Sequence, residues 1–273
     1  MVMNCKTSPL ISIVTVCYNS AKTIENTLNS VLNQTYDNYE YWVIDGGSSD
    51  GTLDILERVS SSFNGRLHYI SEKDSGIFNA MNKGIKKCNG DIIGLLNSDD
   101  SYDSQTLSIV AKKYVAENHK YLIIIGDLMR VSSKGERIYK YHFSQDLVEK
   151  KLCFGHPSMF AAKSVYDKIG LYDESYKLAS DGDWQLRAME DQNIKVVLSP
   201  YVFNYMREGG ASDSFKNRWR WFYERVRMMK THHRGNIIKN ILMEFKKVLV
   251  TDLKYLLPTK WASKAYKLKY KND

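Results

Sequence analysis

Short apolar runs alternate with amphipathic stretches over the first hundred residues. The runs that predict strands cover residues 10–17, 39–44, 67–70 and 92–96. The stretches between them place apolar residues on one helical face and predict helices over 23–32, 52–59 and 77–88. Strands that alternate with helices of this length are typical of right-handed βαβ units. We therefore expect an α/β fold with a mostly parallel sheet.

The pattern is less regular after residue 103. A strand is predicted near 121–125 and a helix near 182–191, with polar loops between them. From Phe215 the chain has a helical pattern nearly to its end. We expect a domain boundary near residue 214.

Polar residues follow each predicted strand of the first half. Tyr18 comes after the first strand, Asp45 after the second, Asp74 after the third, and Asp99-Asp100 after the fourth. In open parallel sheets ligands bind outside the carboxyl ends of the strands. These side chains therefore predict one ligand site.

Charge is unevenly distributed along the 273 residues. Residues 215–273 hold sixteen Lys and Arg against four Asp and Glu, whereas residues 1–214 hold 23 against 27. The formal net charge of +8 thus comes from the C-terminal segment. This distribution argues against nucleic-acid binding by residues 1–214 and favours an anionic partner for the segment that follows.

The spacing of the cysteines and the length of the apolar runs indicate the cellular compartment of the protein. The four cysteines are widely spaced and form no Cys-x-x-Cys pair, which argues against a zinc site or a disulfide framework. Leu10–Cys17 is better explained as a buried strand than as a signal peptide, because no cleavage site follows it. No apolar run reaches the length of a transmembrane helix. We expect a cytoplasmic protein.

Asp99 and Asp100 are candidates for a metal site. Two carboxylates at a strand end are costly to bury unless they meet a cation, and oxygen ligands suit Mg²⁺ or Mn²⁺. The alternative is a turn followed by a helix N-cap, because Asp serves both purposes.

The glycine-rich segment Asp45–Thr52 joins a predicted strand to a helix. It has neither the spacing of a dinucleotide fingerprint nor the Gly-Lys-Ser/Thr of a phosphate loop. Asp45 could accept hydrogen bonds from a base or ribose, or could simply hold a tight turn.

Four further residues are candidates for acceptor chemistry. Asp181 and Asp183 lie at the start of a predicted helix, where the helix dipole keeps a carboxylate ionised, so either is a candidate base or an N-cap. His156 is a candidate metal ligand or acceptor contact, or a hydrogen-bonded loop residue. Trp184 is a second candidate acceptor contact.

The motifs together resemble family 2 of the inverting glycosyltransferases, which have the GT-A fold. The resemblance covers about residues 10–214 and rests on the order and spacing of several motifs. They are Ile13–Asn19, Ser30–Thr35, Asp45–Thr52, Ser71–Ile77, Met81–Gly84, Gly90–Ile92, Leu96–Asp100, Gly170–Glu174 and Asp181–Asp183.

The resemblance implies a nucleoside-diphosphate sugar, usually UDP-linked, and a Mg²⁺ or Mn²⁺ ion. The nucleotide half would cover about 10–103 and the acceptor half about 104–214. The implied nucleotide contacts are Thr15, Tyr18, Asp45, Asp74, Lys83 and Asp99. Asp100, with Asp99, would hold the metal.

The resemblance also implies a base at Asp181, with Asp183 as the alternative. The chain departs from the family pattern at three positions. Asn97 and Met81 stand where many relatives carry Asp and Arg, and Ser180 replaces the Glu that precedes the base. The expected acceptor is a glycan or a lipid-linked molecule, and surface polysaccharide synthesis is the expected context.

Two other functions compete with this interpretation. A metal-dependent nucleotidyltransferase also uses paired carboxylates, but normally carries a basic glycine-rich loop early in the chain, and Tyr18-Asn19-Ser20 is not one. A catalytically inactive nucleotide-sugar binding module would be expected to lack the acids, which are present here.

The basic C-terminal segment has two interpretations. Its apolar residues recur at helical spacing among lysines, and it also carries tryptophans. It could lie as an amphipathic helix on the inner face of an anionic membrane. Alternatively, the apolar face packs on protein while the lysines stay solvated. The apolar residues are Ile238, Ile241, Leu242, Phe245, Val248 and Leu249.

Overall fold

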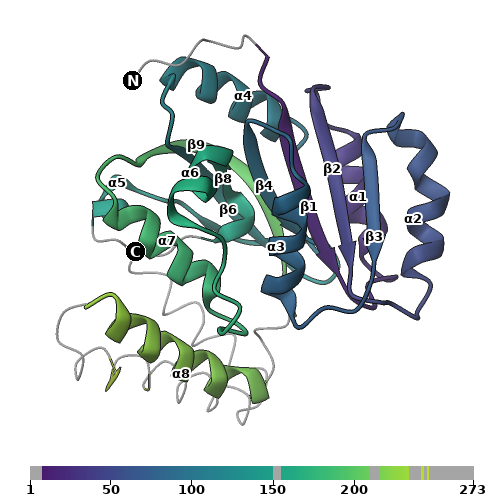
Figure 1. The fold of residues 1–273 in the computed structure, drawn as a ribbon. Coiled ribbons are helices and arrows are strands. Elements are labelled where there is room, and N and C mark those ends of the chain that lie inside the picture. The colour runs from purple at the N-terminus through teal and green to yellow at the C-terminus, as the bar shows by residue number, and fades with distance from the viewer. Residues whose placement is uncertain (1–7, 150–154, 210–214, 234–240, 243–244, 246–273) are drawn as a thin grey trace. The chain divides into compact units, whose positions relative to one another are not determined.

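The computed structural model describes residues 8–149, 155–209, 215–233, 241–242 and 245. The chain forms two compact units, Met1–Glu208 and Gly209–Asp273. In the first unit, the described residues form a nine-stranded sheet flanked by helices. Its strands follow the order β3-β2-β1-β4-β8-β6-β9-β5, and β7 pairs with β6 (Figure 1).

The first half of the sheet is parallel. It consists of β1 (Ile11–Cys17), β2 (Tyr39–Asp45), β3 (Leu67–Ser71) and β4 (Ile92–Asn97). Every strand and helix predicted here appears within one residue of its expected bounds. Cys17 pairs with Asp45, and Asp45 with Ser71, so three strands end at the same level.

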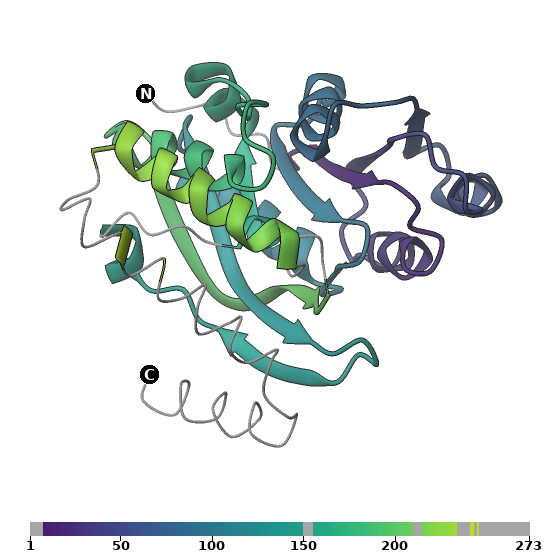
Figure 2. The same cartoon turned by 90° about the horizontal axis from the view of Figure 1, so that it is seen from below.

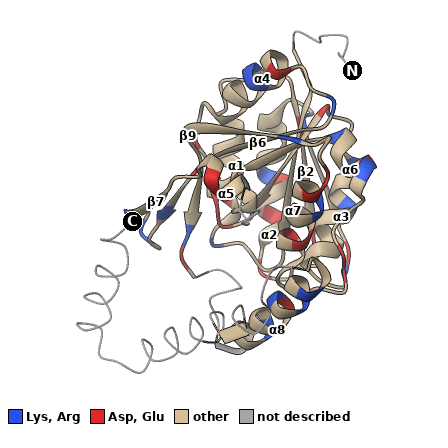
Figure 3. Ribbon diagram, turned by 90° about the vertical axis from the view of Figure 1, so that its left-hand side faces the viewer, with Lys and Arg blue, Asp and Glu red and all other residues tan. Residues whose placement is uncertain are grey.

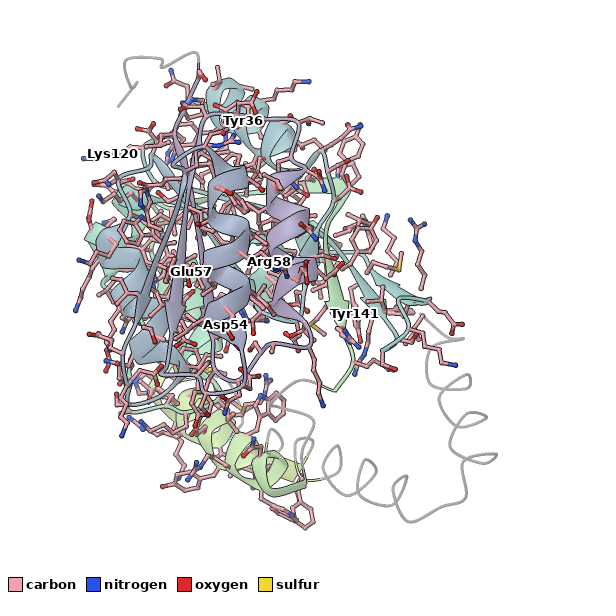
Figure 4. All side chains as sticks on the ribbon, turned by 90° about the vertical axis from the view of Figure 1, so that its right-hand side faces the viewer. Tyr36, Asp54, Glu57, Arg58, Lys120 and Tyr141 are labelled. Carbon is pink, nitrogen blue, oxygen red and sulfur yellow. The ribbon has the colours of Figure 1, made fainter. Side chains whose placement is uncertain are left out.

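Helices cover both faces of this parallel part. Figure 2 shows α1 (Ile24–Leu32) and α3 (Ile77–Lys87) on opposite sides of β1. The outer face of α2 (Thr52–Ser60) is charged, and it presents Asp54, Glu57 and Arg58 to solvent (Figure 4). This pattern of apolar and polar positions is the amphipathic one from which the helices were predicted.

The second half of the sheet mixes strand directions. β8 (Met159–Ala162) lies antiparallel between β4 and β6 (Leu122–Val131), and the long β9 (Lys195–Arg207) runs parallel to β6. β7 (Arg137–Tyr141) pairs only with β6. The other elements here are α4 (Thr106–Glu117), α5 (Gln145–Glu149), η2 (His156–Ser158), α6 (Lys163–Ile169) and α7 (Ser180–Glu190), and η1 (Ser61–Phe63) follows α2.

A short strand brings the end of the chain's first unit back to the paired carboxylates. β5 (Ser101–Tyr102) follows Asp100 directly and pairs antiparallel with β9, so that Ser101 lies opposite Tyr205. Arg207, the last residue of β9, therefore lies next to Asp100.

The second unit contains α8 (Phe215–Thr231), which confirms a helix at the start of the C-terminal segment. Within this unit Trp219, Phe222 and Phe245 form an aromatic cluster with ring centroids about 6 Å apart. Lys and Arg recur along α8 (Figure 3). Among the residues that the structure describes, no helix has the length and apolar character needed to cross a membrane.

Part of the predicted tail lies outside the described residues. This applies to Ile238, Val248 and Leu249. Ile241, Leu242 and Phe245 are described, and Leu242 is 63% exposed.

Candidate functional site

Tyr18 and Asp74 meet around Gly46 at the ends of the parallel strands. A Cβ atom on Gly46 would lie 2.7 Å from Asp74 Oδ2 and 3.4 Å from Tyr18 Cδ2. A Cβ at this position would require the Asp74 carboxylate to move, so glycine leaves room for the side chains of Asp74 and Tyr18. Tyr18 remains 65% exposed and leaves a large aromatic surface at the edge. Two of the residues predicted to contact the nucleotide are thus brought together.

Asp45 lies at the same edge but is completely buried. Its Oδ2 accepts hydrogen bonds from Gly47 N at 3.1 Å, Ser48 N at 2.9 Å and Ser71 Oγ at 2.6 Å. Burial raises the pKa of Asp45, but hydrogen bonds from Ser48 and Ser71 outweigh it and hold the pKa below its ordinary value. Asp45 therefore organises the turn, and its predicted contact with base or ribose stays a prediction.

Two other predicted nucleotide contacts are placed differently. Thr15 is fully buried in the middle of β1, where its hydroxyl lies 2.9 Å from the hydroxyl of Tyr41. The structure does not bring Thr15 to the edge, because a strand buries its central residues between the helices on its two faces. Lys83 lies near the edge, but its Nζ pairs with Glu72 Oε1 at 2.6 Å.

The carboxylates after β4 are shielded from solvent. Asp100 is 1% exposed, and its two oxygens accept hydrogen bonds from Asn97 Nδ2 at 3.0 Å and from the Arg207 backbone N–H at 2.9 Å. Burial and the neighbouring negative charge of Asp99 raise the pKa of Asp100 to about 7. Burial also raises the pKa of Asp99. Both carboxylates would be stabilised in their charged form by a cation.

The donor set at this edge fits a Mg²⁺ or Mn²⁺ ion that is completed by a substrate. Within the described ranges, no group of three or more His, Cys, Asp and Glu side chains could hold a metal by itself. Mg²⁺ is commonly held by one or two carboxylates together with substrate phosphates and water. Asp99 and Asp100 are two such carboxylates, and the hydrogen bonds that Asp100 accepts from Asn97 and Arg207 come from neutral donors, a side-chain amide and a backbone N–H.

His156 connects Asp181 to this edge. Its Nε2 lies 3.2 Å from Asn97 Oδ1, and its Nδ1 lies 3.4 Å from Asp181 Oδ2. The residues come from three elements: Asn97 ends β4, His156 begins η2, and Asp181 lies in the first turn of α7. The predicted base and the predicted metal carboxylates are therefore linked through two side chains. His156 has a hydrogen-bonding partner in Asn97, and its role as a metal ligand or acceptor contact stays a prediction.

Asp183 and Trp184 serve packing. The carboxylate of Asp183 is 7% exposed and pairs with Arg187 Nε at 3.0 Å. Trp184 is fully buried, donates from Nε1 to the Gly170 carbonyl at 2.9 Å and packs on Tyr166. The indole of Trp184 thus lies in the core, and its predicted acceptor contact stays a prediction.

Two residues at this edge had no local sequence signal. Arg207 reaches Asp100 through its backbone, and its Nη2 donates to the Ser133 carbonyl at 2.8 Å. Lys177 Nζ donates to the Ser75 carbonyl at 3.1 Å, close to Asp74. Both come from the second half of the unit, so only long-range strand pairing and loop packing place them here.

Sequence comparison finds one matching family and several relatives. The family described as "Glycosyl transferase family 2" matches residues 12–172. The "PGL/p-HBAD biosynthesis glycosyltransferase" of Mycobacterium bovis is 27% identical over 213 residues, which cover 77% of this chain and 82% of the relative. An uncharacterized glycosyltransferase of Rickettsia typhi is 28% identical over 186 residues, which cover 64% of this chain and 57% of the relative.

Solved structures resemble the chain in fold. S. aureus TarS 1-349 in complex with UDP-GlcNAc has a TM-score of 0.65 at 18% identity, over 92% of this chain and 76% of TarS 1-349. The mannosyltransferase PcManGT of Pyrobaculum calidifontis, in complex with GDP-Man and Mn²⁺, has a TM-score of 0.60 at 20% identity, over 96% and 76% of the two chains. The match spans 42% of a longer TarS chain. These likenesses confirm the predicted α/β fold of the GT-A class.

Proposed function

We propose that this chain, which belongs to glycosyl transferase family 2 and is a glycosyltransferase, moves a sugar from a nucleoside-diphosphate sugar to a hydroxyl group with inversion. The observation that carries the proposal is the connection between Asp181 and the carboxylates after β4. His156 and Asn97 bridge them, so a base and a phosphate-binding edge belong to one site.

The donor would lie across the ends of β1 to β4. Tyr18 offers an exposed ring for a base, and Asp74 lies beside it. We favour a UDP-linked sugar, because TarS is known in complex with UDP and with UDP-GlcNAc. GDP is the alternative, since PcManGT is known with GDP-Man.

Asp99 and Asp100 would hold a divalent ion together with the diphosphate of the donor. The buried carboxylate of Asp100 and the partly buried one of Asp99 repel each other when both are charged, which supports this assignment, as does the Mn²⁺ in the complex of PcManGT. When bound, the ion would neutralise the negative charge that develops on the leaving diphosphate.

Asp181 would act as the base. It takes the proton of the acceptor hydroxyl while that oxygen bonds to the anomeric carbon, from the face opposite the diphosphate. The bond between the anomeric carbon and the diphosphate oxygen breaks, and its electron pair leaves with the nucleotide. One displacement inverts the configuration. Asp183 is a poorer candidate because Arg187 already holds its carboxylate.

The acceptor would be a glycan or a lipid-linked molecule in surface polysaccharide synthesis. The second unit would hold the enzyme on the inner face of the cell membrane. Exposed Trp219 and Tyr223 on α8, together with the basic composition of residues 215–273, support that location.

The test is release of UDP by the full chain. A panel of nucleotide sugars would first be screened for thermal stabilisation of the protein in the presence of Mn²⁺. The best donor would then be incubated with candidate acceptors. We expect UDP release that requires both acceptor and metal, and that is lost in Asp100→Ala and in excess EDTA. Full activity in excess EDTA would exclude the metal assignment, and pyrophosphate release would instead indicate nucleotidyl transfer.

A further inference from the structure

His156 occupies a central position between two side chains that the proposed reaction needs. Its own side chain is 16% exposed, and that of Asp181 is 28% exposed. Asp183 is fixed by an ion pair with Arg187 of the same helix, whereas the side chain that Asp181 meets is His156. The Asp181 carboxylate is thus contacted by a residue from a different element, η2.

The hydrogen-bonding partners determine how the imidazole is oriented. An ionised Asp100 accepts hydrogen bonds but cannot donate them. Its hydrogen bond with Asn97 therefore requires the Nδ2 of Asn97 to face it. The Oδ1 of Asn97 then faces His156, and a carbonyl oxygen only accepts, so Nε2 of the imidazole carries a proton. The opposite nitrogen, Nδ1, faces Asp181. An ionised carboxylate also only accepts, so a hydrogen bond from His156 to Asp181 requires a proton on Nδ1 as well. An aspartate at position 97 would place two carboxylates together and break this sequence of contacts.

We propose that His156 is a positioning residue, which holds the carboxylate of Asp181 at a set place relative to the end of β4. This inference rests on the proposed function, because it concerns the base of that reaction. A general base must lie within hydrogen-bond reach of the proton that it takes, and small displacements lower the rate steeply. The contacts from Asp100 through Asn97 to His156 tie the position of the base to the edge where the donor would bind.

A purely structural role for His156 makes a different prediction. If the imidazole only filled space in the loop, its ring nitrogens would not respond to a change at Asp181. A substitution at position 156 would then lower the stability of the protein by the same amount whether or not Asp181 is present. Two experiments separate these possibilities, and the first does not depend on activity.

The first experiment measures the ring nitrogens of His156 by NMR in the full chain labelled with ¹⁵N-histidine. The chain has six histidines, and the His156→Asn spectrum identifies the signals of interest. We expect a protonated Nε2, and we expect Asp181→Asn to shift the Nδ1 resonance. Asp191→Asn is the matched control, because Asp191 follows the other end of α7 and pairs with Lys168. An Nδ1 resonance that Asp181→Asn leaves unchanged overturns the inference.

The second experiment separates kcat from KM in the UDP-release assay. We expect His156→Ala to lower kcat about tenfold or more, the effect of losing one polar contact to a charged group, with little change in donor KM. His156→Asn keeps a nitrogen near the place of Nδ1 and should recover much of kcat. In an Asp181→Asn background, His156→Ala should cause no further loss, because it acts through the same carboxylate.

If the effects of His156→Ala and Asp181→Asn on kcat were fully additive, the inference would be contradicted. If the unsubstituted chain released no UDP from any nucleotide sugar, the proposed function would fail, while the NMR experiment would still decide whether His156 positions Asp181. Should His156→Ala fail to fold, the Asn variant and the Asp181→Asn spectrum carry the test.

Discussion

Asp45 and Asp181 show how similar side chains acquire different roles from their surroundings. Asp45 is the last residue of β2, and Asp181 lies in the first turn of α7. Asp45 is completely buried and accepts bonds from the backbone of its own turn. Asp181 is partly exposed and faces an imidazole from another element. The first arrangement stabilises structure, and the second leaves a carboxylate accessible to a substrate.

Asp181→Asn should lower transfer about a hundredfold or more, because an amide cannot take the proton of the acceptor. Affinity for UDP with Mn²⁺, measured by calorimetry, should stay close to that of the unsubstituted chain. Asp183→Asn is the comparison. If that variant were inactive while Asp181→Asn kept its activity, the base would have to be reassigned to Asp183.

Asp45→Ala should destabilise the first unit. Its loss removes the hydrogen bonds that the backbone N–H groups of Gly47 and Ser48 donate to its carboxylate, and a hydrogen bond to a charged group is worth about 1.5–3 kcal/mol. The pKa of Asp45 is held below its ordinary value, so its contribution is present above the unfolded pKa and lost as pH falls through the folded pKa.

Urea denaturation near neutral pH measures this difference in the free energy of unfolding. The gap between Asp45→Ala and the unsubstituted chain should narrow in acid. An equal stability of the two proteins at neutral pH would mean that water replaces the carboxylate in the turn.

Helix α3 approaches the sheet closely at a glycine, Gly84. A Cβ atom on Gly84 would overlap Val14 Cγ1 on β1 and lie 3.2 Å from Ile44 Cγ1 on β2. Glycine is a poor helix former, so its presence in the middle of α3 is explained by this contact. The helix that follows Asp74 is thereby held against the strands that end at Tyr18 and Asp45.

Gly84→Ala should therefore lower stability by about 1–3 kcal/mol, the usual cost of overpacking a core, despite the better helix propensity of alanine. Thermal unfolding followed by circular dichroism measures the effect. Adding Val14→Ala should recover part of the loss, because it removes the methyl group that the new Cβ would meet. If the double variant were no more stable than expected from the sum of the single variants, the steric explanation would be incorrect.

The sequence pattern predicted the elements of the first half well and those of the second half poorly. The strands and helices up to Asn97 follow simple periodicities, because β1 and β4 are buried along nearly their whole length and each helix buries one face. Residues 137–141 and 159–162 lack such a pattern. Their pairing with β6 and β4 depends on residues far away in the chain, so a local window contains no signal for it.

In the molecule as a whole, the folded sheet and the excess of basic residues lie in different parts of the chain. The first unit carries the sheet and the candidate site, whereas the basic excess lies in residues 215–273. Exposed aromatic side chains beside Arg and Lys on α8 are the combination found in helices that lie in the headgroup region of a bilayer.

The full chain should float with liposomes that contain anionic lipid, and a chain truncated after residue 213 should not. Neutral liposomes and high salt should weaken the binding, since surface charge attracts the basic segment over about 10 Å at 0.1 M salt. An Arg220→Gln, Arg227→Gln and Lys230→Gln variant is the control for charge. A full chain that stays unbound at low salt would favour packing of the segment on protein.

The order of motifs along the chain was enough to indicate the class of enzyme, the parallel strands and the acids at their ends, because these depend on local periodicity and on residue type. It did not separate Asp181 from Asp183, reveal that Thr15 and Trp184 are buried, or connect His156 to Asn97. Those properties arise where β4, η2 and α7 meet. Which side chains of distant elements face one another follows from packing in three dimensions, and no spacing within a single segment encodes it.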